Sequence, residues 1–261
     1  MNKDEIYADS ISAFNNESNL YHYTTFDGLM KIIISKRFRL TRIDHISDNL
    51  EVNYIDRIWK ARTYIGCFTN SNVNELMWQH YTKSNTGVCI DFGKIDTFGL
   101  KFYDEENNEY KRIPEVDMTY SSYNQTTDYR IHSVSGLKVL YLNDPEYLAI
   151  PNHELIDFFK GVQDVNDRDG FYNHPFQGYV KESRLFKFEQ EFRIRVSILP
   201  KGMGTKLTLR GQIYYSPPKK YIYMETDINT LKVYVKNENP FLDEITSFCN
   251  QNGIEIFVLN F

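Results

Sequence analysis

The segment 187–199 alternates between apolar and charged side chains along its length. Because successive side chains of a strand point to opposite faces, the alternation predicts one long strand with an apolar and a charged face. The stretch that begins at Pro200 ends this strand. The expected apolar face carries Phe188, Gln190, Phe192, Ile194 and Val196, and the expected charged face carries Lys187, Glu189, Glu191, Arg193 and Arg195.

Shorter patterns surround this strand. Period-two or compact apolar runs predict strands over 20–24, 38–41, 64–69, 87–92, 137–142, 221–224, 232–235 and 254–259. Apolar residues at helical spacing predict helices over 26–34, 52–61, 75–81, 153–162 and 240–250. Residues 104–112 are expected to form a solvated loop or a hairpin end, and the polar stretch 163–178 a long functional or mobile loop.

Short strands interrupted by a few helices favour an α+β domain over a doubly wound sheet. We expect a twisted, mostly antiparallel β core, continuous or split, flanked by helices. No shift in composition marks a boundary, so the 261 residues are expected to form a single domain. Within it, the motifs lie in 20–199, and a terminal strand, helix and strand fill 220–261.

Composition and known motifs exclude several classes of function. The formal net charge is −5, which argues against a nucleic-acid scaffold but leaves a local basic patch open. The three cysteines form no close pair, and the histidines lack a metal-ligand spacing, so neither a disulfide framework nor a metal site is expected. Phosphate-loop, dinucleotide-fold and nucleophile-elbow motifs are missing from the sequence. The absence of a signal peptide and of a long apolar run predicts a cytoplasmic chain that does not enter the membrane.

The charged face of the long predicted strand is the first candidate site. Strand geometry would place Glu189, Glu191 and Arg193 side by side, about 6–7 Å apart. Two neighbouring carboxylates repel, which raises the pKa of one, whereas the guanidinium favours the charged form. Such a row could stabilise a developing cation or hold sugar hydroxyls. The alternative is a solvated strand face with balanced charges.

Two further groups are candidates. His22 lies on the first predicted strand, where it could bind a ligand or act as an acid or base, or could be a structural residue. Tyr23 and Thr24 follow it and add hydroxyl groups, which could equally be turn and cap residues. Trp78 and Tyr81 share a predicted helix and could stack on a planar ligand or pack in the core.

Three groups of segments together resemble a bacterial domain-of-unknown-function family, the one numbered twenty-nine seventy-one. The first is Leu20-Tyr-His-Tyr-Thr-Thr with Ser47-Asp-Asn-Leu-Glu. The second is Cys67-Phe-Thr, Met77-Trp-Gln-His-Tyr and Gly87-Val-Cys-Ile-Asp-Phe. The third is Lys181 followed by Phe188-Glu-Gln-Glu-Phe-Arg. The matching segments extend from residue 20 to residue 193.

That family is similar to the ADP-ribosyltransferases, which bind NAD in a cleft of a split sheet. The resemblance implies that NAD is the substrate, that no metal is needed, and that an unidentified protein or nucleic acid accepts the ADP-ribose, as in toxins and phage-defence effectors. It implies roles for His22 at the adenine-side ribose, for Thr69 or Tyr81 against the cofactor, and for Glu191, with Glu189, at the nicotinamide ribose. Stacking on nicotinamide would fall to Tyr23, Trp78 or Tyr81, and the other contacts to Thr24 and Arg193. The alternative is a non-catalytic nucleotide-binding or partner-binding module of the same fold.

Overall fold

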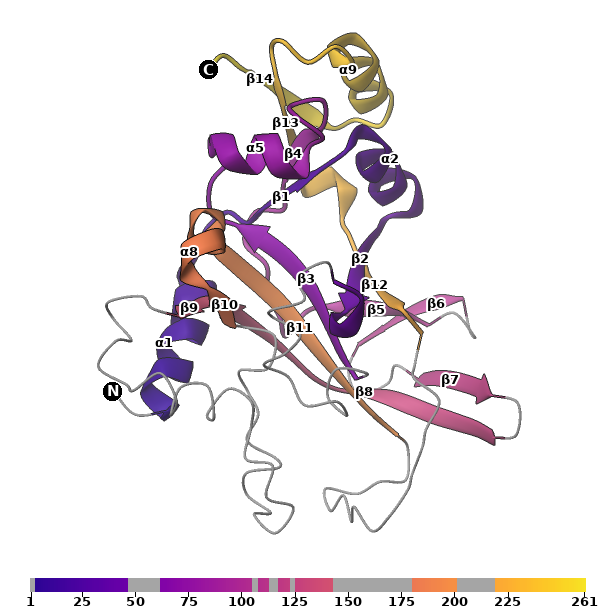
Figure 1. The fold of residues 1–261 in the computed structure, drawn as a ribbon. Helices are drawn as coiled ribbons and strands as arrows, with labels where there is room; N and C mark the ends of the chain where they lie inside the picture. Colours follow the sequence, from indigo (N-terminus) through magenta and orange to yellow (C-terminus); the bar gives the residue numbers. More distant parts are fainter. Residues whose placement is uncertain are drawn as a thin grey trace.

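A computed structural model describes residues 3–46, 62–104, 108–112, 117–122, 125–142, 180–200 and 219–261. The predicted helices 52–61 and 153–162 and the predicted loop 163–178 lie outside these residues. The described part folds around one large sheet whose strands pair antiparallel, apart from β13 and β14 (Figure 1). A second, two-stranded parallel sheet joins β9 (Leu140–Leu142) to β10 (Val180–Glu182).

The order of strands in the main sheet is β14-β13-β4-β1-β3-β2-β12-β5-β6. A branch continues from β3 through β11 and β8 to β7. The strands of the main path are β1 (Tyr21–Thr24), β2 (Arg37–Arg42), β3 (Thr63–Thr69), β4 (Val88–Asp91), β5 (Lys101–Asp104), β6 (Glu109–Arg112), β12 (Tyr221–Glu225), β13 (Lys232–Lys236) and β14 (Glu255–Leu259). The branch consists of β7 (Asp117–Ser122), β8 (Gln125–Lys138) and β11 (Glu191–Pro200).

Strand β3 is shared between two neighbours on one edge. Its end at Thr69 pairs with Tyr21 of β1, whereas Ile65 and Tyr64 pair with Thr41 and Arg42 of β2. The sheet therefore divides along this edge, while the opposite edge of β3 pairs continuously with β11.

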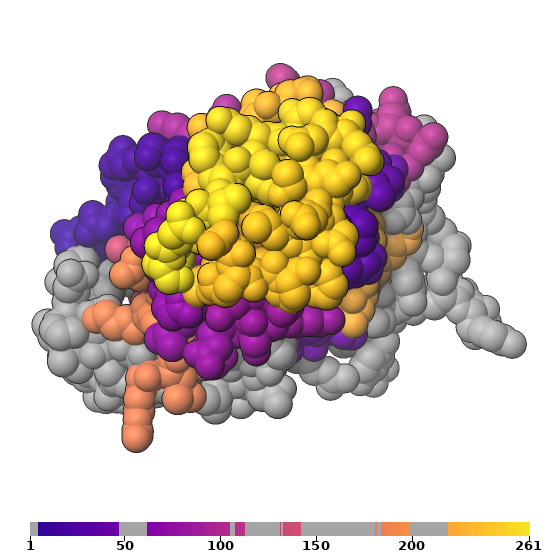
Figure 2. All heavy atoms as spheres, turned by 90° about the horizontal axis from the view of Figure 1, so that it is seen from above, coloured from indigo at the N-terminus to yellow at the C-terminus, as the bar shows by residue number. Residues whose placement is uncertain are grey.

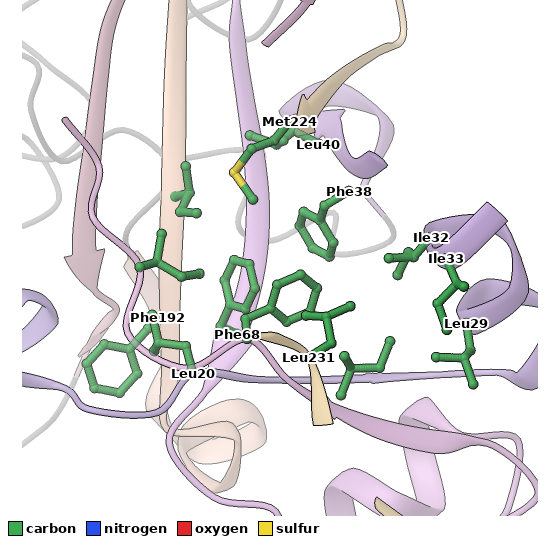
Figure 3. Packing of buried hydrophobic residues seen from close by; sticks show 14 of the residues in the cluster. Leu20, Leu29, Ile32, Ile33, Phe38, Leu40, Phe68, Phe192, Met224 and Leu231 are labelled. Atoms are coloured by element: carbon green, nitrogen blue, oxygen red, sulfur yellow. The ribbon is translucent and has the colours of Figure 1, made fainter. Parts of the chain in front are cut away.

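The main core lies on one face of the sheet, under α2 (Phe26–Ser35). Thr25 caps this helix by accepting a hydrogen bond from the backbone N–H of Gly28. The apolar stripe of the helix then packs on aromatic side chains that the strands turn toward it. Figure 3 shows Phe38 and Phe68 in the middle of this cluster, with Leu29, Ile32 and Ile33 on one side and Phe192 on the other.

The opposite face carries a smaller cluster beneath α5 (Glu75–Tyr81). Tyr21 and Tyr23 point to this face because they alternate with His22 along β1. Trp78 and Met77 pack on them from α5. The two faces of β1 thus belong to different clusters, and His22 lies on the other face from Tyr21 and Tyr23.

The end of the chain is tied into the same sheet. Strands β13 and β14 are connected by α9 (Leu242–Gln251), and β13 pairs with β4. The buried Lys236 Nζ lies 2.6 Å from Glu75 Oε2 of α5, and the Asn239 side chain donates to the Gly87 carbonyl. Figure 2 views this end of the molecule from above and shows the C-terminal part of the chain, in gold and yellow, packed together.

Several predicted elements are confirmed to within a few residues, among them β1, α2, β3, α5, β12 and α9. The long strand over 187–199 is wrong in its first part. Residues Lys187–Glu189 form a 3-10 turn, and Gln190 adopts a left-handed conformation with φ of 44°, so β11 begins only at Glu191. The predicted strand 137–142 is interrupted at Val139 and belongs to β8 and β9. The first helix, α1 (Lys3–Asn16), was not predicted.

Helix α1 packs against β8 at a position that requires glycine. A Cβ atom on Gly136 would lie 2.3 Å from the ring of Phe14, which is 1% exposed. Nearby, the Ser10 hydroxyl donates to the Lys138 carbonyl at 2.6 Å. The helix thus reaches the sheet only because residue 136 has no side chain.

We therefore expect Gly136→Ala to lower the free energy of unfolding by about 1–3 kcal/mol, the usual cost of overpacking. Urea denaturation of the purified chain would measure it. Gly99→Ala is the control, since its Cβ would meet only the Asp96 carboxylate at 3.2 Å, which can rotate away. Equal losses in the two variants would contradict the packing of Phe14 on Gly136.

The described residues thus form an α+β domain with a large, mixed, mostly antiparallel open sheet and five helices, the fifth being α8 (Ser183–Phe186). None of the helices in the described ranges is long and apolar enough to cross a membrane.

Candidate functional site

The candidate site is a buried cluster of charges at the start of β11, which we call the acid cluster and define as Lys181, Glu189, Glu191 and Arg193. Their exposed fractions are between 1% and 7%. They lie on the face of the sheet opposite the main core, because residues 191 and 193 alternate with the core residue Phe192. The four residues come from one stretch of the chain, from β10 to the start of β11, and residues from more distant parts of the chain surround them.

Glu191 is the fixed anion of the cluster. Arg193 holds it with two hydrogen bonds, from Nε to Oε1 at 2.7 Å and from the terminal nitrogen to Oε2 at 3.0 Å. Lys181 Nζ lies 2.8 Å from Oε2. Burial alone would raise the pKa of Glu191, but the charges of Arg193 and Lys181 outweigh it and hold the pKa below its usual value.

Glu189 enters the cluster from the 3-10 turn rather than from the strand. The left-handed Gln190 turns the backbone between the two acids, so that both carboxylates reach Lys181. Lys181 Nζ is 2.5 Å from Glu189 Oε2, and the Tyr81 hydroxyl donates to Oε1. Burial, followed by the charge of Glu191, raises the pKa of Glu189.

Two further groups complete the surroundings of the acids, the buried Tyr141 and the partly buried Cys67. Tyr141 on β9 is the strand partner of Lys181 on β10. Its hydroxyl accepts a hydrogen bond from the Glu191 backbone N–H at 2.9 Å. The thiol of Cys67 lies against Glu191, and burial together with that charge raises the pKa of Cys67. Neither Tyr141 nor Cys67 was predicted as part of the site, and Lys181 was noted only within a motif.

Thr69 lies beside Glu191 on β3, as its direct strand partner. Its hydroxyl is fully buried and has no hydrogen-bond partner among the described residues. An unpaired buried hydroxyl costs stability, and it is the kind of group that a ligand can satisfy.

Tyr81 is where the cluster meets the surface. Its side chain is 42% exposed, although its hydroxyl bonds to Glu189. Of the two acids, Glu189 is therefore the one that a ligand arriving beside Tyr81 would meet first.

The structure contradicts both the even strand spacing predicted for Glu189, Glu191 and Arg193 and the alternative of a solvated strand face. The acids are 2% and 4% exposed, and they meet through a turn rather than through strand alternation. The physical reason is that Lys181 and Arg193 compensate both acids, which lowers the cost of burying them.

His22 is not in the acid cluster. Its ring lies on the opposite face of the sheet, edge-on to Phe38 with ring centroids 4.9 Å apart. Its Nδ1–H donates to the Cys67 carbonyl at 2.9 Å, which fixes the tautomer with the proton on Nδ1. Burial lowers the pKa of His22, as does the charge of Arg39, against the effect of the carbonyl.

The remaining predicted residues, Tyr23, Trp78 and Thr24, lie in α5 or close to it. Tyr23 donates its hydroxyl to the Ser71 carbonyl, and the Trp78 indole N–H donates to the Asn72 carbonyl. Their rings pack edge to face with centroids 5.3 Å apart, and Trp78 is fully buried. Thr24 lies under Gly87, where the two backbones approach closely. These three residues are not in the acid cluster.

Chemically, the cluster combines Glu191, whose pKa is lowered, with Glu189, whose pKa is raised, so Glu189 is the first of the two to take up a proton as the pH falls. Nothing in the described ranges gathers three or more His, Cys, Asp or Glu side chains as a metal site. Comparisons with protein-family models, with curated proteins and with solved structures find no match to this chain.

Proposed function

We propose that this chain binds NAD at the acid cluster and breaks the bond between nicotinamide and ribose, passing ADP-ribose to an acceptor. The observation that carries the proposal is the convergence of Glu189, Glu191 and the unpaired hydroxyl of Thr69 on one face of the sheet. The expected resemblance to a domain-of-unknown-function family, which is itself similar to the ADP-ribosyltransferases, suggests the same chemistry, although no family model matches the chain.

The proposal includes an ADP-ribosyltransferase-like split core. Its support is the division of the sheet at β3, which pairs with β1 at one end and with β2 at the other. In this arrangement His22 serves as a positioning residue, because it bonds to the backbone of Cys67 within β3. The residues of β1 on the same face as Glu191 are Tyr21 and Tyr23.

Glu189 and Glu191 would have different roles in the reaction. Nicotinamide leaves with the bonding electron pair, and positive charge develops at the ribose carbon. Glu189, when ionised, would face this charge, and Glu191, whose lowered pKa keeps it ionised at neutral pH, would hold Lys181 and Arg193 in place. Water or an acceptor hydroxyl then forms the new bond and gives up its proton to the Glu189 carboxylate.

We expect Glu189→Gln to reduce NAD turnover about 100-fold, a common loss when one preorganised electrostatic contact is removed. Release of nicotinamide by the purified chain would measure it. Lys181 keeps Glu191 as a partner in this variant, so the fold should be retained. Because the pKa of Glu189 is raised, turnover in the wild type should fall with decreasing pH at values above those typical of a free carboxyl.

The exposed Glu255→Gln, on β14, is the matched control and should leave turnover unchanged. Turnover equal in the wild type and in Glu189→Gln would remove this residue from the reaction. A wild type that binds NAD without releasing nicotinamide would contradict the enzyme.

A non-catalytic binding module is the second candidate. It is favoured by the complete compensation of the acid cluster, in which two cations face two anions within 3.0 Å. Calorimetry with NAD and with ADP-ribose distinguishes the two functions, since a module would bind both and change neither.

A further inference from the structure

A second surface, distant from the acid cluster, lies on the outer side of β2, β12, β5 and β6 (Figure 1). The inner side chains of these strands are buried, among them Phe38, Ile222, Met224 and Phe102. The alternate side chains therefore point outward. Strand pairing sets Arg39 beside Tyr223 and Tyr103 beside Tyr110, with Arg37 beside Glu225 and Lys101 beside Arg112. We call this surface the tyrosine–arginine face.

Rings and cations alternate across the face. The guanidinium carbon of Arg37 is 3.3 Å from the centroid of the Tyr103 ring, and that of Arg39 is 4.5 Å from the centroid of the Tyr221 ring. The rings of Tyr103 and Tyr110 lie 5.4 Å apart. The Nε of Arg37 is buried without a hydrogen-bond partner among the described residues. Planar rings beside cations can hold both a base and its phosphate.

The face is positive although the chain is acidic. Among the described residues of these four strands and of the residue before β12, the outward-pointing charges are five cations, Arg37, Arg39, Lys101, Arg112 and Lys220, and one acid, Glu225, which Lys101 pairs at 3.0 Å. The acids of the β5–β6 hairpin, Asp104 and Glu109, point to the opposite side of the sheet, where Lys111 forms ion pairs with both. With a formal net charge of −5 for the chain, this concentration of positive charge is local.

One end of the face opens into a pocket of about 430 Å³. Lys101 and Glu225 belong to both the face and the pocket, and Lys36, Thr226, Asp227 and Asn229 are among the other residues that line it. The Thr226 hydroxyl is buried and has no hydrogen-bond partner among the described residues. The pocket therefore offers two lysines, two acids and an unsatisfied hydroxyl group at the end of the row of rings.

We propose that the tyrosine–arginine face binds single-stranded RNA. Bases would stack on the exposed parts of the tyrosine rings, and the phosphates would lie against the arginine and lysine side chains. The occupant is RNA rather than DNA because the ribose 2′-hydroxyl can bond to the phenolic oxygens at the edges of the rings. This surface is separate from the acid cluster, and its binding does not depend on cleavage of NAD.

Fluorescence anisotropy of the full chain with a labelled, unstructured RNA of about 16 nucleotides tests the proposal. Tyr223→Leu should weaken binding about five-fold or more, whereas Tyr223→Phe, which keeps the ring but removes the phenolic oxygen, should keep most of the affinity and lose part of the preference for RNA over DNA. Arg39→Ala should weaken binding and reduce the slope of log affinity against log salt by about 0.7. Lys232→Ala removes an exposed cation from β13, at the far end of the strand order, and should change neither quantity.

Two additional ligands separate the sources of binding. The DNA of the same sequence should bind more weakly than the RNA, and so should an RNA duplex, whose bases are not free to stack. No binding to RNA at low salt would overturn the proposal, as would equal losses in Arg39→Ala and Lys232→Ala. Tighter binding of the DNA or of the duplex would overturn the assignment to single-stranded RNA.

Discussion

Replacing Glu191 with glutamine should lower the free energy of unfolding by about 3–5 kcal/mol, the cost of leaving buried cations without their counter-charge. Glutamine keeps the shape of the side chain, so the loss isolates the charge. Arg193 is 1% exposed, makes two short contacts to this carboxylate, and cannot give up its proton. Lys181 would keep Glu189 as its partner. Urea denaturation of the wild type and the variant would measure the difference.

The direction of the pH dependence follows from the pKa shift. Glu191 has a lowered pKa in the folded chain, so its charge contributes stability above the ordinary pKa of a glutamate and loses that contribution as the pH falls. The difference between the wild type and Glu191→Gln should therefore shrink toward acidic pH. Glu189 has a raised pKa, and its ionisation opposes folding as the pH rises past its ordinary value.

The control for this prediction is Glu255→Gln, which removes an exposed carboxylate and should cost much less. If Glu191→Gln were as stable as the wild type at neutral pH, the carboxylate would not be compensating a buried cation. The acid cluster would then be open to water in solution.

Replacing Trp78 with alanine should also cost about 3–5 kcal/mol, as expected for truncating a fully buried aromatic side chain. The indole is 0% exposed, packs edge-on to Tyr23, and donates its N–H to the Asn72 carbonyl. Trp78→Phe should lose less because it keeps most of the apolar volume. Both values come from the same denaturation experiment.

Phe98→Ala is the matched control for size, because the Phe98 side chain is 92% exposed and its removal leaves no cavity. This comparison also decides between the two roles that the sequence left open for Trp78. A Trp78→Ala variant with unchanged stability and lost NAD binding would show that the ring serves a ligand rather than the core.

Much of the sheet could be predicted because its strands alternate in a simple way. The second half of the 187–199 pattern is correct, and Phe192, Ile194 and Val196 all enter the main core. The first half failed because nothing about a glutamine signals a left-handed backbone, and Gln190 adopts one. The acids therefore meet as predicted, but through a different geometry.

The burial of the acids could not be predicted from their own segment. It depends on Lys181 and Tyr141, which are brought to Glu191 by tertiary structure rather than by spacing along the chain. The face on which His22 lies was equally hidden, because alternation along β1 separates two faces but does not say which one the acids share. That assignment needs the pairing of Tyr21 with Thr69, and of Thr69 with Glu191.

Lys181 and Tyr141 are both carried by the small sheet of β9 and β10, not by the large one. Release of these two short strands would therefore separate Lys181 from the other residues of the acid cluster while the twelve-stranded sheet stays folded. Amide hydrogens of this pair should exchange sooner than those of β3 and β11. Binding at Glu189 would then depend on the fraction of molecules in which β9 and β10 are docked, so a partner that binds these two strands would change the occupancy of the site through the position of Lys181.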